Sequence, residues 1–189
     1  KIIGIINADD KYNSGSFFAI QKAYQENVKG TIFFSDLIVN YGSEEIIMKA
    51  DNRISSIKSG ASQISHPTMF VPKEIYAKYG YFNLEFDTYG ADRELVLRFK
   101  TRKVNFCKLN HNISTFNFGG ATSNYNLKNI LKQTTQEFNL LKKYFPISIS
   151  LKTTLKMFLR LLRNLFLSKI LSPSRFLKLR IKKVGFKNK

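Results

Sequence analysis

Two adjacent carboxylates, Asp9 and Asp10, follow an apolar run that is rich in isoleucine, residues 2–6, with only Asn7 and Ala8 between. A short apolar run closed by polar residues is typical of a buried parallel strand. The pair would then lie at the carboxyl end of that strand, where open α/β sheets bind their ligands. Neighbouring carboxylates repel each other, and a hard divalent cation relieves that repulsion. The alternative is that the pair begins a turn and caps the next helix.

The composition favours one folded domain with an appendage. The chain has 189 residues, and its 43% of hydrophobic residues exclude a largely disordered protein. The single cysteine, Cys107, cannot form an internal disulfide, which favours a reducing compartment. Lys1 already stands in a strand-like run with no signal peptide before it, so we expect the downstream piece of a longer protein.

The net charge of +18 is distributed unevenly along the chain. Residues 151–189 carry 12 of the 31 lysines and arginines and none of the 13 acidic residues. This change of composition predicts a boundary near Pro146. We therefore expect a folded domain over residues 1–125, a packing helix over 126–145 and a basic amphipathic tail over 146–189.

The hydrophobic periodicity indicates an α/β protein with a mixed sheet. Helices are predicted over residues 14–27, 72–79, 92–101 and 126–144, and strands over residues 2–6, 31–35, 45–49, 68–71, 104–108 and 113–118. Either Ser14 or Ser16 could cap the first helix. In the helix over residues 92–101, the apolar spacing turns Leu95, Val96 and Phe99 inward.

Five short motifs occur in a fixed order along the chain, and they are NADD, HPTMFVPKEIY, KYGYFN, GADRELVLRF and FNFGGATS. As an ordered set over residues 2–123 they resemble the downstream half of bacterial family 2 glycosyltransferases of the GT-A fold. The resemblance implies a truncated, Rossmann-like mixed sheet with flanking helices, followed here by C-terminal amphipathic basic helices. The upstream half of such an enzyme, which grips the nucleotide base, is absent from this sequence.

The resemblance implies metal-dependent, inverting transfer of a hexose from a nucleotide sugar, expected to be UDP-linked. The acceptor would be a glycan or a lipid-linked sugar in the synthesis of a cell-surface polysaccharide. Asp10 would be the metal ligand, and Asp9 would contact the ribose or the water shell of the metal, with Asn7 also on the donor side. Mg²⁺ or Mn²⁺ suits such oxygen ligands and would neutralise the departing diphosphate.

Inverting transfer needs a base that takes the proton from the acceptor hydroxyl. Asp92, at the start of its predicted helix, matches the catalytic aspartate of the family. A helix N-terminus favours the charged carboxylate. The alternative is that Asp92 only caps its helix. Ala91 stands where the family often has a further acidic residue.

Five other residues are weaker candidates. Gly119 and Gly120 match the family's terminal glycine pair, where the backbone can approach a ligand, although a plain turn would also need them. His66 matches a position that lines the cleft near the acceptor, and it could equally be structural. Asp36, which follows a predicted strand, is more often a structural residue. Arg98 could pair with a carboxylate, reach a phosphate or be solvated.

The tail after Pro146 combines an apolar face with a basic stripe. The apolar face consists of Leu155, Phe158, Leu159, Leu162, Leu165 and Phe166. The basic stripe consists of Lys152, Lys156, Arg160 and Arg163. This pattern favours an anionic membrane surface over nucleic acid, and it predicts a cytoplasmic protein that is peripheral on the inner face of the cell membrane.

Other functions remain open for the sequence. The apolar face of the tail could instead bind a partner helix, or the tail could be a solvated appendage. The alternative to a transferase is a non-catalytic protein that binds membranes or nucleic acid, or an inactive fragment of a glycosyltransferase.

Overall fold

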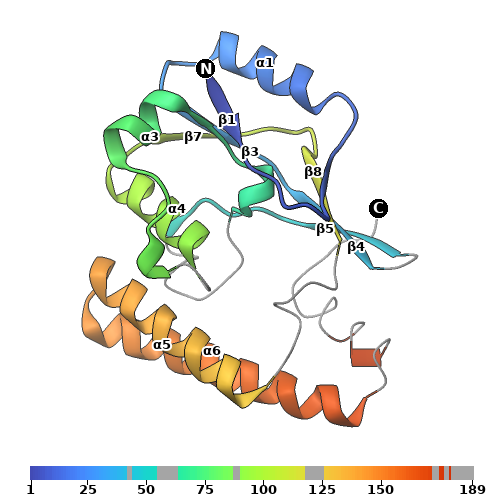
Figure 1. Ribbon diagram of the computed structural model, residues 1–189, viewed down its shortest axis with the longest axis vertical. Coiled ribbons are helices and arrows are strands. Elements are labelled where there is room, and N and C mark those ends of the chain that lie inside the picture. The colour runs from blue at the N-terminus through green and yellow to red at the C-terminus, as the bar shows by residue number, and fades with distance from the viewer. Residues whose placement is uncertain are drawn as a thin grey trace.

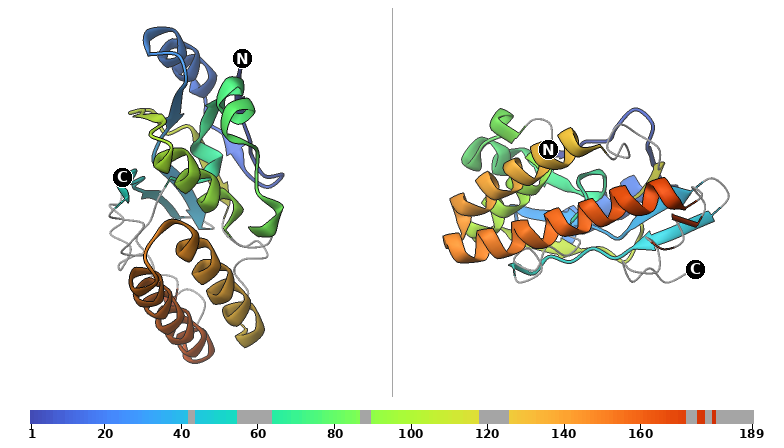
Figure 2. Two further views of the ribbon diagram at one scale, coloured as in Figure 1. Left: turned by 90° about the vertical axis from the view of Figure 1, so that its left-hand side faces the viewer. Right: turned by 90° about the horizontal axis from the view of Figure 1, so that it is seen from below.

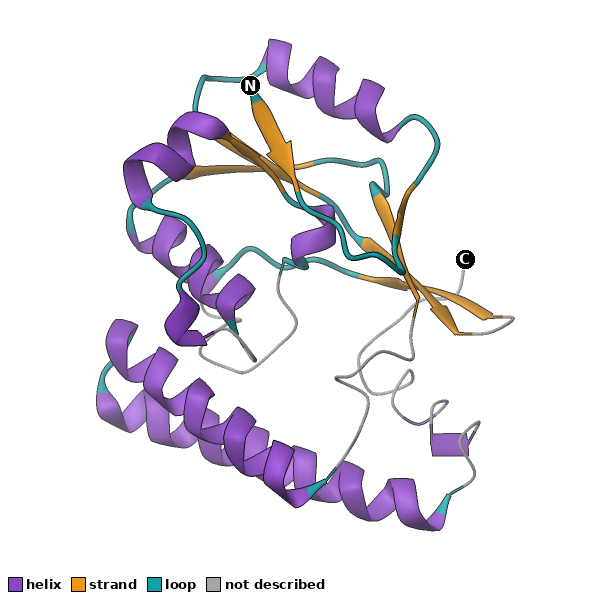
Figure 3. Ribbon diagram, in the orientation of Figure 1, coloured by secondary structure: helices purple, strands orange, loops and turns teal. Residues whose placement is uncertain are grey.

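A computed structural model describes residues 1–41, 44–54, 64–86, 90–117, 126–171, 175–176 and 179. Within these residues the chain forms two four-stranded mixed sheets, and helices pack on both faces of the first (Figures 1 and 3). The mixed α/β class predicted from the sequence is therefore confirmed.

The first sheet has the strand order β1-β6-β3-β7, and the second has the order β2-β8-β4-β5. The strands are β1 (Ile2–Gly4), β2 (Lys11–Tyr12), β3 (Thr31–Phe34), β4 (Leu37–Tyr41), β5 (Glu44–Met48), β6 (Phe70–Pro72), β7 (Asn105–Lys108) and β8 (Ser114–Asn117). The helices are α1 (Ser16–Glu26), α3 (Lys73–Tyr79), α4 (Ala91–Thr101), α5 (Leu127–Tyr144) and α6 (Ile147–Ile170), with short 3-10 turns η1 (His66–Thr68) and η2 (Leu84–Phe86).

Strand β3 lies at the centre of the core, because its side chains are buried on both faces of the first sheet. Ile32 and Phe34 point to one face, where they pack in a cluster with residues of α3 and α4. Phe33 points to the other face and packs in a cluster with Ile20 of α1. The period-2 alternation of strand side chains explains why one apolar run serves both layers.

Helix α4 confirms the predicted inward face, since Leu95, Val96 and Phe99 are at most 1% exposed. A third cluster, in which Leu97 packs with Phe86, Leu140 and Leu141, joins α4 to α5. Helix α6 then packs along α5, so that the two helices lie side by side on the outer side of α4 (Figure 2).

The prediction of a buried parallel strand at residues 2–6 was wrong in two respects. β1 pairs antiparallel with β6, and its residues are half-buried at the edge of the described sheet, with Ile5 38% exposed. An apolar run indicates burial, but the direction of the neighbouring strand depends on residues that are distant in sequence.

Three local predictions also needed correction. Gly15, with a φ of 76°, stands at the N-cap of α1 in place of Ser14 or Ser16. β4 was not predicted, although Leu37 and Val39 show the alternation of a strand. The predicted strand over residues 68–71 begins only at Phe70, since the residues before it form η1.

Candidate functional site

The strand directions bring several of the predicted site residues to one edge of the first sheet. β6 is antiparallel to both β1 and β3, and β3 is parallel to β7, so β6 alone runs in the opposite direction. The carboxyl ends of β1, β3 and β7 therefore meet the amino end of β6. Asp9 and Asp10 follow β1, Asp36 follows β3, and His66 precedes β6. This edge is where open α/β sheets bind ligands.

The Asp9–Asp10 pair lies in a turn that is held by asparagine side chains. The N–H of Asp10 donates to the carbonyl of Asn7 at 3.2 Å, and Nδ2 of Asn7 donates to Oδ2 of Asp10 at 3.1 Å. The backbone N–H of Asn117, the last residue of β8, donates to Oδ1 of Asp10 at 3.1 Å. The Asn117 side chain also donates to the Asp9 carbonyl. The pair thus begins a turn, but it does not cap α1, whose N-cap is Gly15.

The donor chemistry of this turn fits a hard divalent cation. Asp9 is exposed and Asp10 is partly exposed, so both carboxylates are accessible to solvent. Each oxygen of Asp10 accepts one hydrogen bond, which leaves further lone pairs for a ligand. Within the described residues no group of three or more His, Cys, Asp or Glu side chains could hold a metal ion. A cation here would therefore need ligands from a bound phosphate or from water.

His66 and Asp92 are far apart in sequence, and the fold brings them together. Nδ1 of His66 lies 3.7 Å from Oδ2 of Asp92, whose side chain is 45% exposed. Gly90, with a φ of 106°, stands at the N-cap of α4, so Asp92 is the second residue of the helix and is not its cap. Oδ1 of Asp92 accepts a 2.8 Å hydrogen bond from the N–H of Arg93.

The surroundings of Asp92 favour its charged form. Desolvation raises the pKa of Asp92, but the interaction with the nearby His66 and the backbone N–H of Arg93 lower it by more. The pKa of Asp92 therefore lies below the ordinary value of an aspartate. A carboxylate in this state can accept a proton at neutral pH.

The two parts of the site are linked through β8 and η1. No hydrogen bond or ion pair among the described residues joins Asp92 to Asp9 or Asp10. Instead, η1, which contains His66, packs against β8, whose last residue holds the Asp10 carboxylate. Gly119 and Gly120, which follow β8 in the sequence, lie outside the described residues.

Asp36 lies at the same sheet edge, and its carboxylate forms ion pairs with two lysine side chains. Oδ2 of Asp36 lies 2.8 Å from Nζ of Lys49, and Oδ1 lies 2.6 Å from Nζ of Lys108. The N–H of Ala50 also donates to Oδ1 at 2.8 Å. Burial raises the pKa of Asp36, but these three donors outweigh it and hold the pKa below its ordinary value. The contacts agree with the structural role that was expected for Asp36.

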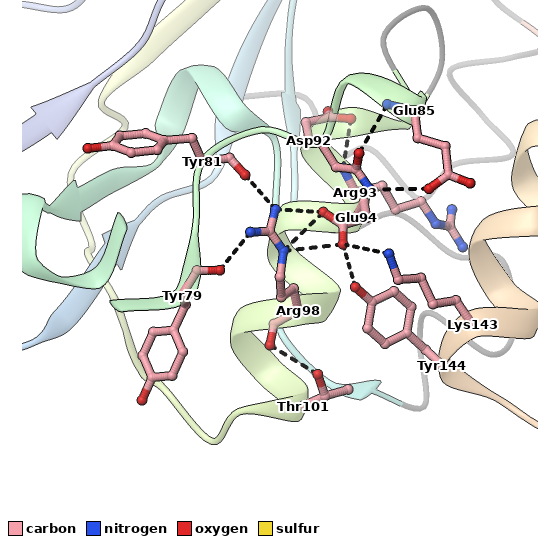
Figure 4. A network of polar contacts seen from close by, with 11 residues as sticks. Tyr79, Tyr81, Glu85, Asp92, Arg93, Glu94, Arg98, Thr101, Lys143 and Tyr144 are labelled. Atoms are coloured by element: carbon pink, nitrogen blue, oxygen red, sulfur yellow. Dashed lines mark hydrogen bonds and ion pairs between the residues drawn. The ribbon is translucent and has the colours of Figure 1, made fainter. Parts of the chain in front are cut away.

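A network around Glu94 was missed by sequence reasoning. Glu94 is 1% exposed, and Arg98 grips its carboxylate with Nη2 at 2.7 Å and Nε at 3.2 Å (Figure 4). The hydroxyl of Tyr144 from α5 also donates to Glu94. The remaining donors of Arg98 bind the carbonyls of Tyr79 at 2.7 Å and Tyr81 at 2.6 Å. Arg98 therefore pairs with a carboxylate, and the i, i+4 spacing of the pair was the available signal.

A cavity of about 440 Å³ lies beside this network. Glu94, Arg98, Lys143 and Tyr144 line it, together with residues at the end of α4. Neither the carboxylate pair nor His66 lines this cavity. Because Glu94 and Arg98 satisfy each other, we assign these polar groups to the packing of α4 against α5 rather than to the chemistry of the sheet edge.

A further ion pair ties α4 to the C-terminal helices. Nη2 of Arg93 lies 2.8 Å from Oε1 of Glu137 on α5. Burial raises the pKa of Glu137, and the charges of Arg93 and of Arg160 on α6 oppose this shift. The residue next to Asp92 is thus connected to both C-terminal helices.

His111 has no counterpart in the motif set, and its contact in the fold is with Ser16 of α1. Nε2 of His111 lies 3.3 Å from Oγ of Ser16, and that hydroxyl donates to the carbonyl of Ile113 at 2.7 Å. Ser16 is 1% exposed. We read this contact as a link between α1 and the segment before β8.

Comparison with known proteins adds no family assignment to this geometry. No protein-family model, curated protein or solved structure matches the chain. The fold and the site together define a mixed α/β protein with acidic residues at one sheet edge and a histidine–aspartate pair beside it.

Proposed function

We propose that this chain performs metal-dependent, inverting transfer of a hexose from a nucleotide sugar, with UDP as the nucleotide. The acceptor is a glycan or a lipid-linked sugar in the synthesis of a cell-surface polysaccharide. The main support is that one sheet edge holds the solvent-accessible pair Asp9–Asp10 and, through η1, the pair of His66 and Asp92.

Asp92 acts as the base in this proposal. Its carboxylate takes the proton of the acceptor hydroxyl while that oxygen attacks the anomeric carbon, and the bond from this carbon to the diphosphate oxygen breaks. Its charged form at neutral pH leaves the carboxylate free to take a proton, and its partial exposure gives an acceptor access to it. His66 is a positioning residue, because it orients the carboxylate and favours its charged form.

Asp9 and Asp10 would hold a divalent cation at the diphosphate end of the donor. Mg²⁺ or Mn²⁺, when bound, would neutralise the charge that develops on the leaving diphosphate. Asn7 and Asn117 hold the Asp10 carboxylate in place, so the turn is organised before the donor binds.

Calorimetric titration of UDP with and without Mn²⁺ tests this assignment. We expect binding that requires Mn²⁺ and that is lost in the Asp10→Ala variant. Asp51→Ala is the control, since it removes a carboxylate that pairs with Arg53 and belongs to neither Asp9–Asp10 nor Asp92, and it should bind as the unmodified chain does. Metal-independent binding, no binding at all, or equal binding by the Asp10→Ala variant would each contradict the proposal.

A further inference from the structure

The side that helix α6 presents to solvent coincides only in part with the apolar face predicted from periodicity, sharing Leu155, Leu159 and Phe166 with it. The residues that α6 buries are four polar residues and one leucine, and they are Ser150, Thr153, Thr154, Leu161 and Asn164. This mixed face is the one that packs along α5. Of the apolar side chains predicted to form one face, Leu155, Leu159 and Phe166 are exposed, while the other three are half-buried.

The apolar side chains of α6 form an exposed stripe. Its members are Ile147, Leu151, Leu155, Leu159, Phe166 and Ile170, each between 54% and 65% exposed. The first four recur at four-residue intervals, and the last two continue on the same side of the helix. Large apolar residues that are exposed singly are ordinary, but a contiguous row marks an interaction surface.

A basic row runs beside this stripe. Lys152, Lys156 and Arg163 are exposed, and each lies one or four residues after a member of the stripe. Arg160 lies further round, where its charge acts on Glu137 of α5. The sequence of α6 contains no acidic residue. The basic row therefore has no carboxylate on its own helix to neutralise it.

The geometry points to an anionic lipid surface as the occupant of this face. An amphipathic helix that lies in the plane of a membrane inserts its apolar side between the headgroups and places its cations at the lipid phosphates. A nucleic acid would leave the six apolar side chains in water. No helix within the described residues is long and apolar enough to cross a membrane, so α6 would lie along the surface.

This inference goes beyond the proposed transferase activity, and it needs neither nucleotide nor metal. Binding to the membrane would hold the chain next to acceptors that are anchored there. The charge of Arg160 on α6 acts on Glu137 of α5, and Glu137 pairs with Arg93, the residue next to the proposed base Asp92. The helix that carries the base, α4, is thus connected through α5 to the membrane-binding helix α6.

Flotation with vesicles tests the inference directly. The chain should float with vesicles of phosphatidylcholine and phosphatidylglycerol, and much less with phosphatidylcholine alone. The double variant Leu155→Ser, Leu159→Ser should bind at least about tenfold more weakly to the anionic vesicles. The control Val28→Ser, Leu84→Ser removes two apolar residues that are 73% and 82% exposed elsewhere, and it should float normally.

The charge contribution is measured with a second pair of variants. Lys152→Gln, Lys156→Gln should weaken binding to anionic vesicles about tenfold, and added salt should reduce the difference. Lys29→Gln, Lys73→Gln removes two exposed lysines outside α6 and should have a smaller effect. Circular dichroism checks that each variant is folded, which is expected because every changed side chain is exposed.

Two results would overturn the inference. The first is equal flotation of the Leu155→Ser, Leu159→Ser variant and of its control, Val28→Ser, Leu84→Ser. This result would show that the exposed stripe does not contact lipid. The second is an absence of vesicle binding together with stripe-dependent dimerisation, or with tight binding to duplex DNA at physiological salt. A second copy of the chain or a nucleic acid would then be the occupant.

Discussion

Nδ1 of His66 and Oδ2 of Asp92 lie 3.7 Å apart at the amino end of α4. His66 reaches this position because η1 directly precedes β6, the strand that runs opposite to its neighbours. Asp92 reaches it as the second residue of α4, while Gly90 occupies the N-cap. Two segments that form separate motifs in the sequence thus become one polar pair.

Replacing Asp92 by asparagine should remove the proposed base without changing the shape of the side chain. We expect the rate of hexose transfer to fall by about 10²–10⁴-fold, while Mn²⁺-dependent binding of UDP is unchanged. Steady-state kinetics and calorimetry measure the two effects separately. Glu74→Gln is the control, because Glu74 also lies in the first turn of a helix, α3, but is exposed there. A variant that keeps its transfer rate would exclude Asp92 as the base.

Replacing His66 by asparagine should change the pH dependence of transfer. His66 lowers the pKa of Asp92, so its removal should raise that pKa. Because only the charged form of Asp92 accepts a proton, the acidic limb of kcat/KM should move to higher pH. A purely structural role of His66 would lower the rate at every pH and leave the limb in place. His111→Asn, which changes the histidine beside Ser16, should not move it.

Asp36 should make the stability of the fold depend on pH. Its pKa is lowered in the folded state, so its contribution is complete above the unfolded value of about 4 and is lost as the pH falls through the lower folded value. Asp36→Asn should therefore cost about 1–3 kcal/mol at pH 7 and less in acid. The expected cost is moderate because Lys49 and Lys108 are 58% and 40% exposed and can be solvated.

Urea denaturation at pH 7 and at acidic pH measures this effect. The control is Asp51→Asn, since the ion pair of Asp51 with Arg53 is exposed and such pairs contribute about 0–1 kcal/mol. A cost for Asp36→Asn that does not change with pH would contradict the assignment.

Glu94→Gln should be the most destabilising polar change in α4. The variant leaves the Arg98 guanidinium, whose side chain is 18% exposed, without its carboxylate, and we expect a loss of about 3–5 kcal/mol. Tyr144→Phe removes only one hydrogen bond to Glu94 and should cost about 1–2 kcal/mol. Glu85→Gln, at an exposed glutamate of η2, is the control. Urea denaturation of the three variants should rank their losses of stability in this order. Equal losses would show that the buried Glu94–Arg98 pair does not contribute more to stability than the other contacts.

The local spacing of apolar and capping residues was sufficient to predict much of the fold. The apolar spacing of Leu95, Val96 and Phe99 determined both the helix and its buried face, because a single helix face must enter the core. Asn126, which was expected to begin the next helix, accepts a hydrogen bond from the N–H of Asn129 as its N-cap. The run over residues 31–35 likewise predicted β3, whose side chains are all buried.

Part of the candidate site was also visible in the sequence. Asp9 and Asp10 were placed after a strand, and Asp92 was placed in the first turn of its helix, from their positions next to apolar runs alone. The partners of these residues were not predictable. Asn117 holds Asp10 across 107 positions of the chain, and no short-range periodicity encodes such a contact.

The sequence by itself determined most of the elements, the acidic pair and the basic tail, because these follow from neighbouring residues and their spacing. Only the tertiary structure decided that β6 runs against β1, that His66 meets Asp92, and that α6 leaves Leu151, Leu155 and Leu159 in solvent. The physical reason is that strand direction and helix orientation depend on which surfaces bury each other. That choice is made between segments far apart in the chain.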